Sequence, residues 1–85
     1  MDIVFTPTGW TEYSKWLAED KKTVQKINKL IKSIDRDGPL SGEGKPEKLR
    51  HIDGYSRNID EKNRLVYQYA KEKVTILSCE GHYQD

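Results

Sequence analysis

In the first half of the chain, hydrophobic residues recur every three or four positions, which is the spacing of one face of an α-helix. The first stripe consists of Trp10, Tyr13, Trp16 and Leu17. The second consists of Val24, Ile27, Leu30, Ile31 and Ile34. Residues that begin and end helices flank the two stripes: Thr6 or Pro7, then Asp20, then Asp37-Gly38-Pro39. We therefore expect two consecutive helices.

The hydrophobic period changes to two in the second half of the chain, after a loop rich in Gly and Pro at residues 40–46. An alternating pattern is typical of strands. The expected strands are residues 55–60, 64–70 and 73–79, with a further one at 47–50 and a short first strand at 3–5. The connections at 60–63 and 71–72 are short, as in an antiparallel meander.

The order strand, helix, helix, strands predicts an α+β fold. In it, two N-terminal helices pack on one face of a four- to five-stranded, mainly antiparallel sheet. A chain of 85 residues can build only one hydrophobic core, so residues 1–85 are expected to form one domain. Two helices cover only one face of the sheet. The other face must therefore meet solvent, a ligand or a partner.

Alternation along the strands predicts which side chains lie on that open face. The covered face is expected to hold Leu65, Tyr67 and Tyr69, and the open face Arg64, Val66 and Gln68. By the same parity, the side chain of Ile59 points inward and those of Asn58 and Asp60 point outward.

Composition narrows the class of protein without naming a function. Only 34% of the residues are hydrophobic and the mean hydropathy is -0.92, so the core must be thin. The net charge is +1, yet residues 21–32 contain five lysines and no acid. That stretch is either a solvated helix face or a basic stripe that follows a phosphate backbone.

The one cysteine, Cys79, cannot form an internal disulfide and is expected to be a buried strand residue rather than a nucleophile. We see no signal peptide, and no apolar run approaches the ~20 residues that span a bilayer. A cytoplasmic protein without membrane contact is the expectation.

Several classes of site are not indicated by the residues present. The histidines and the cysteine match no metal-binding spacing, the glycine-rich segment at 42–45 lacks the Walker pattern, and no serine lies in a nucleophile elbow. The candidates that remain are polar residues near strand ends: Lys45, Glu47, Arg50, His51, Arg57, Arg64, His82 and Tyr83. Each also has an ordinary structural interpretation, so composition and spacing leave the function undecided.

Four segments together resemble the Txe/YoeB toxins, which belong to the wider RelE-like group of toxin–antitoxin modules. The segments are Glu43-Gly44-Lys45-Pro46-Glu47-x-Leu49-Arg50-His51, Tyr55-Ser56-Arg57-x-Ile59-Asp60, Asn63-Arg64-Leu65-Val66-Tyr67 and His82-Tyr83. The likeness extends from Met1 to Tyr83 with the motifs in order. It implies a RelE-like fold and an endoribonuclease that acts, without a cofactor, on messenger RNA in the ribosomal A site. It also implies a cognate Phd/YefM-like antitoxin, operator DNA bound through the antitoxin complex and, by analogy, a homodimer.

The resemblance also implies roles for individual residues. Glu47 is the expected general base, Arg64 a phosphate-binding residue and His82 the expected general acid, and Tyr83 belongs to the same catalytic cluster. The expected contacts to RNA phosphates come from Lys45, Arg50, Arg57 and Asn58. These residue types suit RNA cleavage without a metal. A carboxylate can accept the proton of the ribose 2′-OH, an imidazolium can return one, and an arginine can neutralise the phosphate.

This chain departs from the family at Asn58, where a second arginine usually follows the serine. An asparagine can donate a hydrogen bond but cannot neutralise a phosphate, so weaker stabilisation of the transition state is expected. An alternative is a catalytically weakened RelE-like module that acts with its antitoxin as an autorepressor on operator DNA. A ParE-like gyrase inhibitor is a third interpretation, against which Glu47 and the His82-Tyr83 end argue. Glu80, two residues before His82, is expected either to orient that histidine, to raise its pKa and so keep it protonated as an acid, or to have no role.

Overall fold

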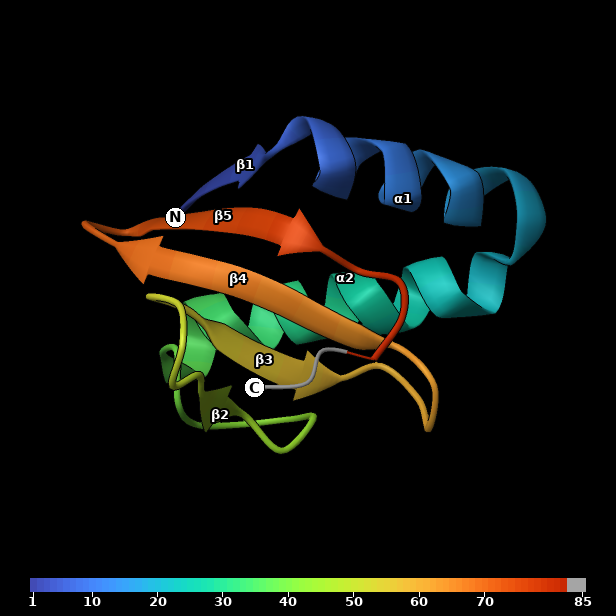
Figure 1. Ribbon diagram of the computed structural model, residues 1–85. Coiled ribbons are helices and arrows are strands. Elements are labelled where there is room, and N and C mark those ends of the chain that lie inside the picture. The colour runs from blue at the N-terminus through green and yellow to red at the C-terminus, as the bar shows by residue number, and fades with distance from the viewer. Residues whose placement is uncertain (83–85) are drawn as a thin grey trace.

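The computed structural model describes residues 1–82, which form two helices and one five-stranded sheet (Figure 1). The elements are β1 (Asp2–Phe5), α1 (Pro7–Glu19), α2 (Lys21–Asp37), β2 (Glu47–Lys48), β3 (Tyr55–Asn58), β4 (Arg64–Ala70) and β5 (Lys73–Ser78). The strand order is β1-β5-β4-β3-β2. β1 runs parallel to β5 and every other neighbouring pair is antiparallel. The predicted α+β class is confirmed.

Both helices begin and end where the sequence predicts. The Thr6 hydroxyl caps α1 by accepting a hydrogen bond from the N–H of Gly9 at 3.0 Å. The Asp20 carboxylate caps α2 by accepting one from the N–H of Thr23 at 3.3 Å. Gly38 ends α2 with a φ of 90°, a conformation that a glycine adopts without strain. Within residues 1–82, neither helix is long and apolar enough to cross a membrane.

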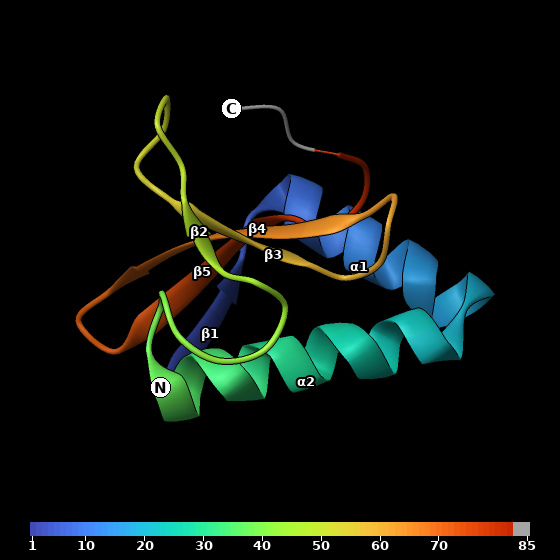
Figure 2. The ribbon, with the colours of Figure 1, turned by 90° about the horizontal axis from the view of Figure 1, so that it is seen from below.

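The hydrophobic core lies between α2 and one face of the sheet, and Figure 2 shows α2 beneath the strands. Its buried members are Ile27, Leu30, Ile31, Ile34, Ile59, Leu65, Tyr67, Val74, Ile76 and Cys79. Tyr13 and Trp16 of α1 pack against this core. Trp10 and Leu17, which belong to the same apolar stripe of α1, are 54% and 49% exposed. α1 lies beside the β1–β5 edge of the sheet (Figure 1), so only part of its apolar stripe is covered.

The start of α1 lies very close to β5. A Cβ atom built on Gly9 would be 2.4 Å from the carbonyl oxygen of Ile76, which only a glycine avoids. The Thr6 hydroxyl lies 3.2 Å from the same oxygen and donates toward it. This contact fixes α1 against the strand that leads into the C-terminal end of the chain.

The predicted alternation of the strands is confirmed at the positions that matter for the open face. Leu65 and Tyr67 are buried against the helices. Asn58 lies opposite Arg64 in the β3–β4 register, so the two share the other face. Val66 is also buried although it belongs to that outer row, because β4 is a central strand flanked by β3 and β5.

Candidate active site

A carboxylate and a guanidinium meet on the open face where β2, β3 and β4 lie side by side. Glu47 of β2 pairs with Ser56 of β3, and Arg64 begins β4. The Nη1 atom of Arg64 lies 3.7 Å from Oε2 of Glu47 and 3.5 Å from the Ser56 hydroxyl oxygen. The Glu47 side chain is 62% exposed and that of Arg64 only 21%. The cation is therefore held against the sheet and the carboxylate faces solvent.

The segment that carries His82 is bonded to the beginning of β4. The N–H of Gly81 donates to the side-chain oxygen of Asn63 at 2.9 Å, and the N–H of Arg64 donates to the carbonyl of Gly81 at 3.0 Å. Figure 1 shows the chain after β5, in red, passing this end of β4. His82 is exposed, and Tyr83 lies outside the described residues. Glu47, Arg64 and the backbone next to His82 thus gather at one end of the sheet.

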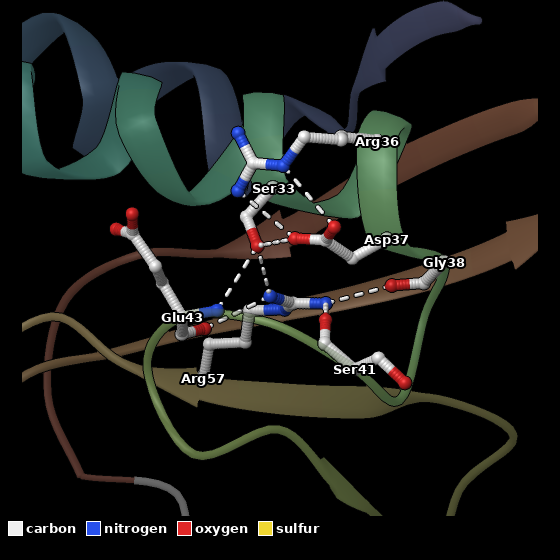
Figure 3. A network of polar contacts seen from close by, with 7 residues as sticks. All are labelled: Ser33, Arg36, Asp37, Gly38, Ser41, Glu43 and Arg57. Atoms are coloured by element: carbon white, nitrogen blue, oxygen red, sulfur yellow. Dashed lines mark hydrogen bonds and ion pairs between the residues drawn. The ribbon is translucent and has the colours of Figure 1, made fainter.

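Arg57 does not lie on the open face, and its predicted contact to RNA is wrong. The side chain is fully buried, and all five N–H groups of its guanidinium donate hydrogen bonds of 2.7 to 3.0 Å inside the protein. The acceptors are the Ser33 and Tyr67 hydroxyls and the carbonyls of Gly38, Ser41 and Glu43. Figure 3 shows the guanidinium among all of them except Tyr67.

Arg57 instead holds the 38–44 segment, which connects α2 to the strand of Glu47. Three of its five acceptors are carbonyls of this segment. The Ser33 hydroxyl supports the same segment, because it accepts a hydrogen bond from the N–H of Glu43 and donates to Asp37. Gly44 lies so close to Leu30 that an added Cβ would be 2.7 Å from its Cδ2 atom. The 38–44 segment is therefore fixed on several sides.

Sequence reasoning missed this internal network, although two signals for it were present. The parity that points Asn58 outward points its neighbour Arg57 inward. Ser33 is a polar residue on the buried side of α2, next to Ile34. A buried hydroxyl needs a partner, and a buried arginine supplies one.

The remaining predicted phosphate contacts lie at or near the open face. Lys45 and Arg50 are exposed and lie on either side of Glu47 along the chain. Lys45 has a φ of 52°, a left-handed conformation that is uncommon for a residue with a side chain. Asn58 is half-buried opposite Arg64. RNA binding by these three residues stays a prediction.

Cys79 and Glu80 are occupied by structural contacts. Burial, together with the nearby Glu12 and Glu80 carboxylates, raises the pKa of the Cys79 thiol to about 12. The predicted burial of Cys79 is confirmed, although the residue lies just after β5 rather than in it. A thiol with a raised pKa is a poor nucleophile. The carboxylate of Glu80 forms an ion pair with Lys15 of α1. This pairing directs Glu80 toward α1.

The open face offers general acid–base chemistry. It presents an accessible carboxylate, a fixed guanidinium and an exposed imidazole close to the same strand ends. Among residues 1–82, no group of three His, Cys, Asp or Glu side chains is arranged to hold a metal ion.

Comparisons with known proteins agree with the observed fold. The model of YoeB-like toxins of bacterial type II toxin–antitoxin systems matches residues 5–83. The toxin YoeB of Mycobacterium bovis is 47% identical over 83 residues, which cover 95% of this chain and 96% of the relative. The chain is also similar to YoeB in the heterotetrameric YoeB–YefM toxin–antitoxin complex of Staphylococcus aureus, with a TM-score of 0.92 and 46% identity over 98% of each chain. The YoeB dimer of Staphylococcus aureus gives a TM-score of 0.93 at the same identity and coverage.

Proposed function

The chain belongs to the YoeB-like toxins of bacterial type II toxin–antitoxin systems, and we propose that it is a ribosome-dependent endoribonuclease that cleaves messenger RNA. The observation that carries the proposal is the pair formed by Glu47 and Arg64 on the open face, 3.7 Å apart. A proton acceptor beside a cation is what an attack on a phosphodiester requires.

In the proposed reaction, the Glu47 carboxylate accepts the proton of a ribose 2′-OH. The 2′-oxygen attacks the adjacent phosphorus, and the bond from phosphorus to the 5′-oxygen breaks. His82, as an imidazolium, donates a proton to that leaving oxygen. The products are a 2′,3′-cyclic phosphate and a 5′-hydroxyl, so protons and bonds balance without a further reactant.

Arg64 stabilises the negative charge that gathers on the non-bridging oxygens in the transition state. A guanidinium matches the geometry of a phosphate through paired N–H groups. Its contact with the Ser56 hydroxyl and its low exposure restrict its orientation before RNA binds. A donor that is already oriented requires little reorganisation during the reaction.

The openness of the site supports the requirement for the ribosome. With 62% of its side chain exposed, Glu47 is surrounded by water that weakens its interactions with a substrate. A large partner that covers the open face would remove this water and fix the messenger RNA beside the carboxylate.

Cleavage of ribosome-bound messenger RNA by the purified protein tests the proposal. The wild type should cut the RNA, and a 2′-deoxy nucleotide at the cleaved position should abolish cutting because no nucleophile remains. Arg64→Ala and His82→Ala should lose activity while keeping the wild-type circular dichroism spectrum. Cutting of the 2′-deoxy substrate would contradict the mechanism.

Expression of the protein alone in cells separates this function from the weakened DNA-binding module. A ribonuclease arrests growth, and the Arg64→Ala variant should not. The accessible pair of Glu47 and Arg64 favours the catalytic interpretation. If the wild type and Arg64→Ala affect growth equally, the catalytic proposal is wrong.

We also infer that the protein binds a YefM-like antitoxin and forms a dimer, as the two Staphylococcus aureus structures describe for YoeB. The exposed apolar residues Ile3, Val4, Trp10 and Leu17 support a partner that covers them. A groove of about 270 Å³ next to Ile3, lined by Phe5 and Ile31 among others, adds to this surface. Co-purification with the product of the adjacent open reading frame, followed by measurement of the mass of the complex, tests both inferences.

A further inference from the structure

We propose that Glu12, Trp16 and Asn63 are positioning residues that place the general acid His82. They do so by holding the C-terminal segment, defined here as residues 79–82. The inference rests on the proposed function, because it assigns these residues to the same reaction. None of the three is part of the site formed by Glu47 and Arg64.

Two side chains of α1 hold the beginning of the C-terminal segment. The N–H of Cys79 donates to Oε1 of Glu12 at 2.7 Å, and Nε1–H of Trp16 donates to the carbonyl of Cys79 at 2.9 Å. Cys79 follows the last residue of β5, so side chains of α1 supply the hydrogen-bond partners that a neighbouring strand would otherwise supply. Cys79 is fully buried, and buried backbone N–H and carbonyl groups need hydrogen-bond partners, so loss of either side chain would leave one of these groups unpaired.

The other end of the segment is held by the turn before β4. The side-chain oxygen of Asn63 accepts a hydrogen bond from the N–H of Gly81, one residue before His82. Asp60 fixes the orientation of Asn63, because its carboxylate accepts hydrogen bonds from the Asn63 amide at 3.1 and 3.2 Å. The Asn63 oxygen is thereby directed toward Gly81 and not toward solvent.

Between these two attachments, Glu80 lines an open groove. The groove has a volume of about 390 Å³, with the first turns of α1 on one side and Glu80 on the other. The ion pair between Lys15 and Glu80 adds a further link from α1. Cys79 is packed in the core, and beyond it directed polar contacts fix the course of the chain toward His82.

This arrangement has a chemical consequence for His82. A general acid must lie within hydrogen-bond reach of the oxygen that it protonates, and a displacement of about 1 Å can cost about 10²-fold in rate. Loss of an attachment should therefore slow protonation of the leaving 5′-oxygen. The side chains of Glu47 and Arg64 contact each other and Ser56 and make none of these attachments, so activation of the nucleophile should be largely preserved.

A change of leaving group separates positioning of the acid from general damage. A 5′-sulfur in place of the 5′-oxygen leaves as a thiolate, whose conjugate acid has a pKa near 8.5 and needs no proton donor. Single-turnover cleavage of ribosome-bound messenger RNA would be measured with both substrates. His82→Ala should be strongly slowed on the oxygen substrate and restored on the sulfur substrate.

Variants of the positioning residues should show the same pattern of rates as His82→Ala, with a smaller loss on the oxygen substrate. We expect Glu12→Ala and Asn63→Ala to cleave the oxygen substrate about 10- to 100-fold more slowly and the sulfur substrate at nearly the wild-type rate. Glu12→Gln should stay near the wild type, because its amide oxygen can still accept from Cys79. The matched control is Glu19→Ala, an exposed glutamate of the same helix.

The results distinguish a failure of this inference from a failure of the proposed function. If the wild type cleaves neither substrate, the proposed function is wrong. If the wild type is active and His82→Ala is not restored by sulfur, His82 is not the acid and the inference falls. If Glu12→Ala and Asn63→Ala keep full activity, or lose it equally on both substrates, Glu12 and Asn63 do not position the acid and the inference is wrong.

Discussion

Nη1 of Arg64 lies 3.7 Å from Oε2 of Glu47, so the residues assigned to phosphate binding and to proton abstraction are neighbours before any substrate is present. The pair joins β4 to β2 across the strand between them. A phosphate that enters this site competes with Glu47 for the guanidinium. In the proposed mechanism, the carboxylate is then left next to the ribose that carries the attacking hydroxyl.

Glu47→Gln should reduce single-turnover cleavage by about 10²- to 10⁴-fold, which is the usual contribution of a general base. The amide keeps the size of the carboxylate but cannot accept a proton at neutral pH. Rates on ribosome-bound messenger RNA measure the effect, with unfolding temperature as the check on structure. The matched control is Glu72→Gln, an exposed position in the turn after β4. Equal rates for wild type and Glu47→Gln would exclude Glu47 as the base.

Asn58→Arg should increase ribosome-dependent cleavage. Asn58 lies opposite Arg64 on the open face, so a second guanidinium there would reach the same phosphate. A hydrogen bond to a charged group contributes about 1.5–3 kcal/mol, which corresponds to roughly a 10- to 100-fold faster reaction. Single-turnover rates measure the change, and Asn58→Gln controls for side-chain length without charge. No increase for Asn58→Arg would mean that the missing charge is compensated elsewhere.

Arg57→Lys should destabilise the fold by about 3 kcal/mol or more, although it keeps the charge. An ammonium has three donors and cannot serve the five acceptors around the guanidinium, so buried oxygens lose their partners. Urea unfolding followed by tryptophan fluorescence gives the free energy of unfolding. Lys29→Arg, on the exposed surface of α2, also keeps the charge and should change it by less than about 0.5 kcal/mol. Similar losses in both variants would contradict the role given to Arg57.

The contribution of Asp37 to the stability of the fold should be lost in acid. Hydrogen bonds from the Arg36 guanidinium, then from the Ser33 hydroxyl, hold the pKa of the Asp37 carboxyl below its usual value of 3.8. Its contribution is therefore complete well above pH 3.8 and is lost as the pH falls below that value toward the pKa of the folded state. Urea midpoints of the wild type and Asp37→Asn should differ at pH 7 and converge at low pH. Arg36→Ala should show a weaker pH dependence than the wild type; an unchanged one would contradict this origin.

The elements of the fold follow from local patterns in the sequence. The apolar stripe of α2 contains Ile27 and Ile34, and the N-cap at Asp20 and the C-cap at Gly38 are short-range signals. β4 was predicted with its observed bounds because Leu65, Tyr67 and Tyr69 recur at every second position between two short turns. The same alternation placed Asn58 and Arg64 on one face. These features depend on residues that are near one another in the chain, so the sequence alone determined them.

Contacts between distant residues were decided only by the tertiary structure. Arg57 belongs to the same short motif as Asn58, yet its five partners lie between 10 and 24 positions away in the chain. The bond between Glu12 and Cys79 spans 67 positions. A sequence motif records that a charged residue is present, but not whether folding surrounds it with carbonyl groups or with water. That difference in surroundings makes Arg57 a structural residue and leaves Arg64 beside Glu47 on the open face.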